Sequence, residues 1–133
     1  MANSTLTTPD SRPLRIALIG AGRHAQHHAR AILRCPGVQL VAVADPSDAA
    51  QAAMRDIVPG IGCFKTPEEL FASERLNVVH IITPPASHAP LARMAIKAGC
   101  HIYVEKPFTE SVEDAQQILD EALCVETDFK PLE

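Results

Sequence analysis

The chain has 133 residues, of which 47% are hydrophobic and 21% are charged, and its formal net charge is −4. This is the composition of one ordinary globular domain, and no apolar run approaches the length needed to cross a bilayer. Lys and Arg are scattered without forming a stripe, and half of the acidic residues lie in 107–133, so we expect neither a nucleic acid nor a membrane as partner.

Residues 1–13 are polar and rich in Thr and Ser, and they lack the basic start and the apolar stretch of a signal peptide. We therefore expect a flexible N-terminal arm and a cytoplasmic protein. The cysteines agree with this location, because none stands in a Cys-x-x-Cys pair and their spacing fits no zinc site. We expect reduced thiols at Cys35, Cys63, Cys100 and Cys124.

The first strong signal is an apolar run, 14–19, that leads directly into the glycine-rich turn of residues 20–25, GAGRHA. The run predicts a strand buried on both faces, and the helical pattern of 24–34 follows the turn. Gly20 permits a sharp turn, and Gly22 lets the backbone approach a phosphate at the helix N-terminus. The pattern indicates a pyrophosphate-binding turn, although two glycines after a strand also fit a plain tight turn.

A second apolar run, 38–44, predicts the second strand and ends in Asp45. An acidic residue at this place holds the ribose hydroxyls of adenosine in dinucleotide-binding folds. The alternative is a turn or cap aspartate, because Pro46 and Ser47 also look like the start of a helix. Together with the glycine-rich turn, Asp45 favours a dinucleotide site.

The rest of the chain continues to alternate between strand and helix patterns. It predicts an α/β fold with a doubly wound parallel sheet, an NAD(P)-binding Rossmann domain over 14–123, and an irregular tail over 124–133. No sixth strand is evident, so the fifth strand is an exposed apolar edge that a protein partner or a second copy of the chain can pair with. The remaining strands are expected at 61–64, 77–82 and 100–104, and the remaining helices at 47–55, from Thr66 onward, from Ser87 to 97, and from Ser111 to about 123.

Two further clusters follow predicted strands at the same edge of the sheet. The first, residues 83–88 (TPPASH), is a proline-stiffened loop that would lie over the cofactor, and its plain alternative is a rigid turn with a helix cap. The second is Glu105-Lys106-Pro107, which places a lysine at the carboxyl end of a strand, where acid–base chemistry would occur. Glu105 would orient the ammonium group, and the plain alternative is a surface salt bridge.

Three histidines near the start of the first helix raise the question of a metal. Positions 24 and 28 share one face of a helix, but a metal site needs a third or fourth ligand, and none is evident in the sequence. We therefore predict no metal site at His24, His27 and His28.

From about residue 15 to residue 123 the chain resembles the N-terminal half of the glucose–fructose oxidoreductase and inositol dehydrogenase (Gfo/Idh/MocA) family. The resemblance rests on the glycine-rich turn with His28, on Ala44-Asp45, on residues 83–88 and, most specifically, on Glu105-Lys106-Pro107. It implies a pyrophosphate site at the turn, a ribose site at the second strand and a nicotinamide site at the last two clusters. The implied cofactor residues are Gly20, Ala21, Gly22, Arg23, His24, Asp45, Thr83, Pro84, His88, Glu105, Lys106 and Pro107, with Lys106 as the catalytic residue.

Members of this family transfer hydride between a sugar or cyclitol hydroxyl and NAD or NADP, and the resemblance implies the same for this chain. Asp45 favours NAD, because its carboxylate would repel a 2′-phosphate, but the sequence leaves NADP open. The family also carries a second domain that supplies the substrate pocket, and this chain shows no such domain, so whether it acts as an enzyme alone stays open.

Two other interpretations remain. The first is a non-enzymatic module that senses nicotinamide nucleotides and binds a partner protein, as the exposed fifth strand and the acidic tail suggest. The second is a truncated and inactive product, which poor thermal cooperativity without rescue by nucleotide would reveal.

Overall fold

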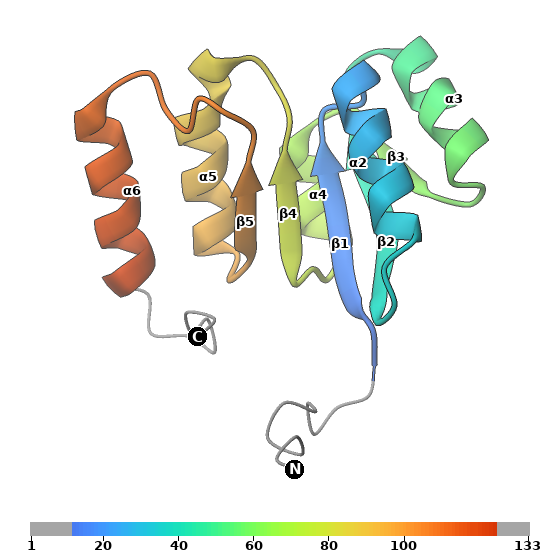
Figure 1. Cartoon of the computed structure of the whole chain (residues 1–133), viewed down its shortest axis with the longest axis horizontal. Coiled ribbons are helices and arrows are strands. Elements are labelled where there is room, and N and C mark those ends of the chain that lie inside the picture. Colours follow the sequence, from blue (N-terminus) through green and yellow to red (C-terminus); the bar gives the residue numbers. More distant parts are fainter. Residues whose placement is uncertain (1–11, 125–133) are drawn as a thin grey trace.

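The computed structural model describes residues 12–124, with Cys124 described by its backbone only. Five parallel strands form one sheet in the order β3-β2-β1-β4-β5 (Figure 1). This order confirms the predicted α/β fold of Rossmann type, in which the chain runs outward from β1 in both directions. The strands are β1 (Leu14–Ile19), β2 (Val38–Ala44), β3 (Gly62–Phe64), β4 (Val78–Ile81) and β5 (His101–Val104).

Helices cover the sheet from both sides (Figure 1). Helices α2 and α3 lie on one face, where they pack on β2, and α5 lies on the other face against β4 and β5, with α6 beside it. A short 3₁₀ turn, η1, precedes α5. The helices are α2 (Arg23–Leu33), α3 (Asp48–Ile57), α4 (Pro67–Ser73), α5 (His88–Lys97) and α6 (Val112–Cys124), and η1 is Pro85–Ser87.

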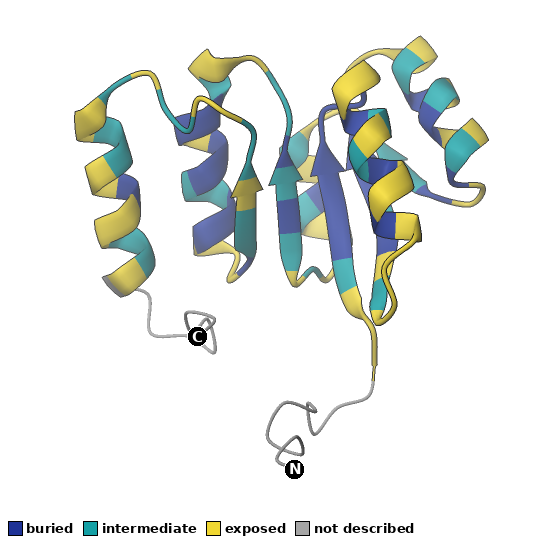
Figure 2. Cartoon of the chain, in the orientation of Figure 1, coloured by how far each residue is buried: buried dark blue, intermediate teal, exposed yellow. Residues whose placement is uncertain are grey.

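The core lies on both faces of β1, as its apolar sequence, interrupted only by Arg15, predicts. Successive side chains of a strand point to opposite faces, so Ile16 and Leu18 pack with α2 and α3. Ala17 packs with Leu70 of α4, and Ile19 packs with α5 and α6. The buried centre of the sheet in Figure 2 therefore fixes the strand ends that carry the site.

Side-chain caps fix the start of three helices, α3, α4 and α6, whereas α2 and α5 begin without one. Thr66 accepts a hydrogen bond from the backbone N–H of Glu69 at 3.1 Å, and Ser111 caps α6 through the N–H of Asp114 at 3.0 Å. The sequence pattern predicts that Ser87 caps α5, and this prediction is wrong. The Ser87 hydroxyl donates to the carbonyl of Pro84 at 2.7 Å, because η1 comes before the helix.

Some predictions fall on the ends of the chain. The N-terminal arm, 1–13, and the tail, 124–133, lie almost wholly outside the described residues and stay predictions. Within the described part of the chain, no helix is both long and apolar enough to span a membrane. The three cysteines whose side chains are described are free thiols, namely Cys35, Cys63 and Cys100.

Candidate cofactor-binding site

The two glycines of the turn after β1 meet different structural demands. Gly20 has a φ of +104°, and a Cβ there would lie 2.3 Å from the carbonyl oxygen of Ile82. Gly22 is the N-cap of α2 with an ordinary φ of −75°, and a Cβ there would meet no atom within 4 Å. Gly20 is thus required by the backbone, whereas Gly22 leaves open space in front of the helix.

The N-terminus of α2 is suited to an anion. Among the described residues, no side chain caps this helix and its first turn holds no acidic group. Arg23 and His24, its first two residues, are exposed beside the uncapped N–H groups. Unpaired N–H groups and the positive end of the helix dipole favour a phosphate at this position.

Asp45 lies at the end of β2, directly against the glycine-rich turn. One carboxylate oxygen accepts the N–H of Ala21 at 2.8 Å, and the other accepts the N–H of Ser47 at 2.8 Å. The aspartate therefore makes the turn contact that the plain alternative predicted. Its place is fixed further by Gln51, a buried residue whose amide donates to the carbonyl of Asp45 at 2.7 Å.

A cavity of about 420 Å³ opens at the carboxyl edge of the sheet. It brings together predicted residues from the ends of three strands, namely Gly20, Asp45, Thr83 and Pro84. The cavity also has walls that sequence reasoning missed, because they follow the three-residue strand β3 or lie on α5. These are Lys65, Pro67, Glu68, Pro90, Leu91 and Met94.

His88 connects the loops that follow β4 and β5. The side chain is 1% exposed, and its ring nitrogens lie 2.8 Å from the carbonyl of Thr83 and 2.7 Å from the carbonyl of Pro107. The ring therefore faces backbone rather than the open crevice. His88 positions both predicted nicotinamide-side clusters, which is a role that the local sequence did not reveal.

Replacing His88 tests this positioning role. We expect His88→Ala to lower the free energy of unfolding by about 2–4 kcal/mol, because it leaves a cavity at a buried position and removes the ring contacts to the carbonyls of Thr83 and Pro107. Chemical denaturation measures the change. The exposed His27→Ala is the matched control and should change stability by less than about 0.5 kcal/mol. If His88→Ala and His27→Ala are equally stable, His88 does not hold the loops after β4 and β5 together.

Glu105, in the loop after β5, pairs with two histidines of α2. The sequence alone predicts the ammonium group of Lys106 as its partner. Glu105 Oε1 lies 2.9 Å from His24 Nε2 and 3.2 Å from His28 Nε2. Desolvation raises the pKa of the Glu105 carboxyl, but the hydrogen bonds to His24 and His28 outweigh it and hold the pKa below its usual value.

His28 also contacts a histidine of the sheet, His80 of β4. His28 Nδ1 lies 2.9 Å from His80 Nδ1, and the His80 ring stacks on Tyr103 with 4.8 Å between ring centroids. Burial, together with the nearby His28, lowers the pKa of His80 to about 4, so this ring is neutral at pH 7.

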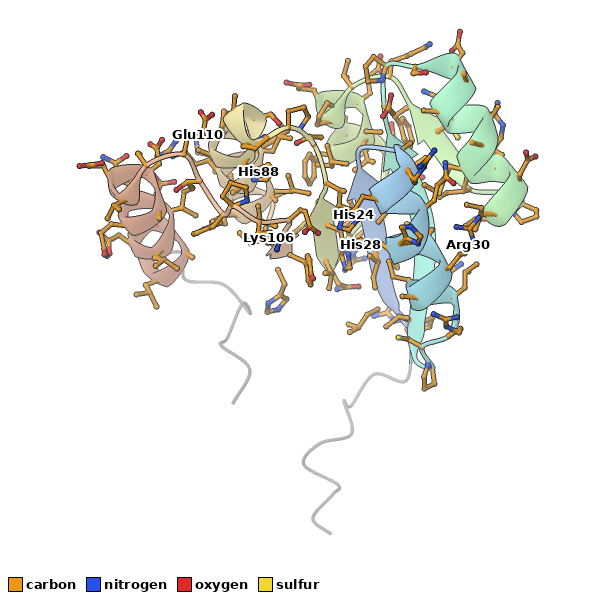
Figure 3. All side chains as sticks on the ribbon, turned by 45° about the horizontal axis from the view of Figure 1, so that its top comes forward. His24, His28, Arg30, His88, Lys106 and Glu110 are labelled. Carbon is orange, nitrogen blue, oxygen red and sulfur yellow. The ribbon has the colours of Figure 1, made fainter. Side chains whose placement is uncertain are left out.

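Figure 3 shows three of the predicted residues, His24, His88 and Lys106, near the carboxyl ends of the strands. His24 and His28 lie on α2, and Lys106 follows β5 with its side chain exposed. The Lys106–Pro107 peptide bond is cis. The structure thus brings the ends of β1, β2, β4 and β5 to the same edge, as expected of a parallel sheet.

The arrangement matches a known family over nearly all of the described chain. A family model described as "Oxidoreductase family, NAD-binding Rossmann fold" (GFO_IDH_MocA) covers residues 14–125. The chain belongs to this family. It is therefore an NAD-binding Rossmann domain of an oxidoreductase family, as the glycine-rich turn and Glu105-Lys106-Pro107 implied.

Curated members of the family are similar at about a third identity. An inositol 2-dehydrogenase of Agrobacterium fabrum is 36% identical over 109 residues, which are 80% of this chain and 32% of that protein. A D-glucoside 3-dehydrogenase of Escherichia coli is 32% identical over 113 residues, 84% of this chain and 32% of that protein. The chain thus spans about a third of the length of these relatives.

Two similar solved structures contain the cofactor. GenD2 from gentamicin A biosynthesis, in complex with NAD, is 28% identical with a TM-score of 0.79, over 88% of this chain and 34% of that one. The WlbA dehydrogenase from Bordetella pertussis, in complex with NADH and UDP-GlcNAcA, is 26% identical with a TM-score of 0.78. The match covers 84% of this chain and 34% of that one. The fold of this chain is therefore that of the NAD-binding part of these proteins.

Proposed function

We propose that the chain is the cofactor-binding part of an oxidoreductase that transfers hydride between NAD and a hydroxyl of a sugar or cyclitol. The observation that carries the proposal is the site at the ends of β1 and β2. There no side chain of the described residues caps the N-terminus of α2, and Gly22 leaves open space in front of that helix. The carboxylate of Asp45 contacts the same turn and lines the cavity together with Gly20. The substrate class is supported by the names of the relatives, which act on inositol and glucosides.

The residues fit the parts of NAD one by one. The helix N-terminus and Gly22 would hold the pyrophosphate, and Asp45 would hold the adenosine ribose. Thr83 and Pro84 line the same cavity on the nicotinamide side. NAD supplies a hydride acceptor when it is bound.

Lys106 is the proposed proton-handling group. It follows β5, the next strand of the sheet beyond β4, and its side chain is exposed at the edge where the nicotinamide would lie. Its amine Nζ would take the proton of the substrate hydroxyl while the carbon beneath that hydroxyl gives up a hydride. The sugar pocket itself would come from a part of the protein beyond these residues, since the relatives are about three times as long.

Calorimetric titration with NADH and NADPH tests the cofactor site. We expect saturable binding that favours NADH by at least about tenfold, and loss of that preference in Asp45→Asn, which keeps the shape and an acceptor oxygen but removes the charge that repels a 2′-phosphate. Asp56→Asn, an exposed change on α3, is the control and should keep the preference. If the folded chain does not bind NADH, the proposal fails.

The sheet edge supports a second candidate function, a nucleotide-sensing module that binds a protein partner or a second copy of the chain. β5 is the last strand of the described sheet, and Tyr103 on it is 51% exposed. A cavity of about 370 Å³ adjoins it, lined by residues of α2, β1 and β4 such as His27, Ile32 and His80. Unpaired strand edges are sites at which another strand adds.

Light scattering after gel filtration, with and without NADH, distinguishes the two functions. Association that depends on NADH favours the sensing module, and a monomer that ignores NADH counts against it. We propose a cytoplasmic location, because residues 1–13 lack the features of a signal peptide and no Cys-x-x-Cys pair is present.

A further inference from the structure

Three metal-binding side chains meet at the end of β5. His24 and His28 are one turn apart on the same face of α2, and Glu105 reaches them from the loop after β5. One ligand atom from each lies within 4.8 Å of the others. The third ligand, which the sequence near His28 lacks, is Glu105. It lies 77 positions further along the chain, and the fold brings it to His28.

The distances are close to those of a metal site. With zinc bonds to nitrogen and oxygen of about 2.0–2.1 Å, two ligand atoms on one tetrahedral ion lie about 3.3 Å apart. Glu105 Oε1 is already 2.9 Å from His24 Nε2 and 3.2 Å from His28 Nε2. The remaining gap, between the two imidazoles, closes by rotation of His24, whose side chain is 57% exposed.

The surroundings hold one ligand in the orientation a metal needs. His28 Nδ1 lies against His80 Nδ1, and the His80 ring is itself stacked on Tyr103. In the tautomer in which His28 donates through Nδ1, its Nε2 lone pair faces Glu105 and is available to an ion. Metal-bound histidines usually donate their second N–H to such a neighbour, which fixes the ring.

We propose that His24, His28 and Glu105 bind one divalent transition-metal ion of the Zn²⁺ class. Two imidazole nitrogens and one carboxylate oxygen are a ligand set that Zn²⁺ accepts, and it leaves a fourth position open to water or to an oxygen of a bound ligand. None of its three ligands lines the cavity of Asp45 and Thr83, although His24 belongs to the first turn of α2, where we place the pyrophosphate. Metal binding is therefore measured without cofactor.

The test uses the full chain, purified without a histidine tag and stripped with a chelator. Co²⁺ is titrated while its visible absorption is followed, and Zn²⁺ is then added to displace it. We expect one ion per chain, intense bands of a four-coordinate Co²⁺ site, and loss of affinity by at least about tenfold in His24→Ala. His27→Ala, one position before His28 on the same helix and exposed, is the matched control and should bind as the unchanged chain does.

A second variant guards against a change of fold. Glu105→Gln keeps the size of the side chain and should weaken Co²⁺ binding while circular dichroism and urea denaturation report a folded domain. Absence of saturable binding by the folded, unchanged chain overturns the proposal. Equal affinities in His24→Ala and His27→Ala also overturn it, because any bound ion would then use other ligands.

Discussion

Gly20→Ala is expected to lower the free energy of unfolding by about 3–5 kcal/mol, a large share of the 5–15 kcal/mol of a typical domain. Two effects combine. A φ of +104° is strained for any residue with a side chain, and the added Cβ would stand 2.3 Å from the carbonyl oxygen of Ile82. That oxygen belongs to the backbone leaving β4, so relief requires the strands to move apart rather than a side chain to rotate.

Gly22→Ala is the matched change two residues later. It should preserve the stability of the fold and weaken NADH binding. Its φ is ordinary and its Cβ would meet nothing within 4 Å, so stability should change by no more than about 1 kcal/mol. The methyl group would instead occupy the space in which the pyrophosphate approaches the backbone. We therefore expect NADH affinity to fall by at least about tenfold.

Urea denaturation and calorimetric titration with NADH separate the two outcomes. The expected pattern is a damaged fold for Gly20→Ala and a sound fold with weak binding for Gly22→Ala. If Gly22→Ala binds NADH as the unchanged chain does, the pyrophosphate does not lie at the N-terminus of α2. If Gly20→Ala is fully stable, the turn after β1 tolerates a side chain and differs from the structure described here.

The elements built from continuous local signals could be predicted from the sequence. The expected strands at 14–19 and 38–44 match β1 and β2, because an apolar run buried on both faces leaves little choice of boundary. The Thr66 cap was equally clear, since its hydroxyl bonds within four residues. The site as a set of strand ends followed from parallel topology, because all carboxyl ends meet at one edge.

Contacts between distant segments could not be predicted in the same way. The hydrogen bonds of His88 to Thr83 and Pro107 depend on how the loops after β4 and β5 meet. The spacing of residues along the chain does not indicate how these loops meet. The pairing of Glu105 with His24 and His28 depends likewise on the N-terminus of α2 and the end of β5 facing each other. Sequence alone paired Glu105 with its neighbour Lys106, whereas the fold gives it partners on another element.

Lys106→Ala is expected to leave NADH affinity within about twofold of the unchanged chain and to reduce turnover by 10²–10⁴-fold, the usual contribution of general acid–base catalysis, roughly 3–5 kcal/mol. Because this chain spans about a third of its relatives, turnover is measured in a fusion of residues 1–124 to the remaining part of the inositol 2-dehydrogenase from Agrobacterium fabrum, with inositol as substrate. NADH formation is followed by absorbance.

The control is Lys97→Ala, which removes an exposed lysine from the last turn of α5, away from the strand ends. It should change neither binding nor turnover. The comparison of NADH affinity with turnover in Lys106→Ala distinguishes a structural from a catalytic role. A group that only shaped the fold would lower NADH affinity and turnover together, whereas a group that moves the substrate proton affects turnover alone. Turnover equal to that of Lys97→Ala would exclude Lys106 from the chemistry, while the NAD site at the ends of β1 and β2 would stand.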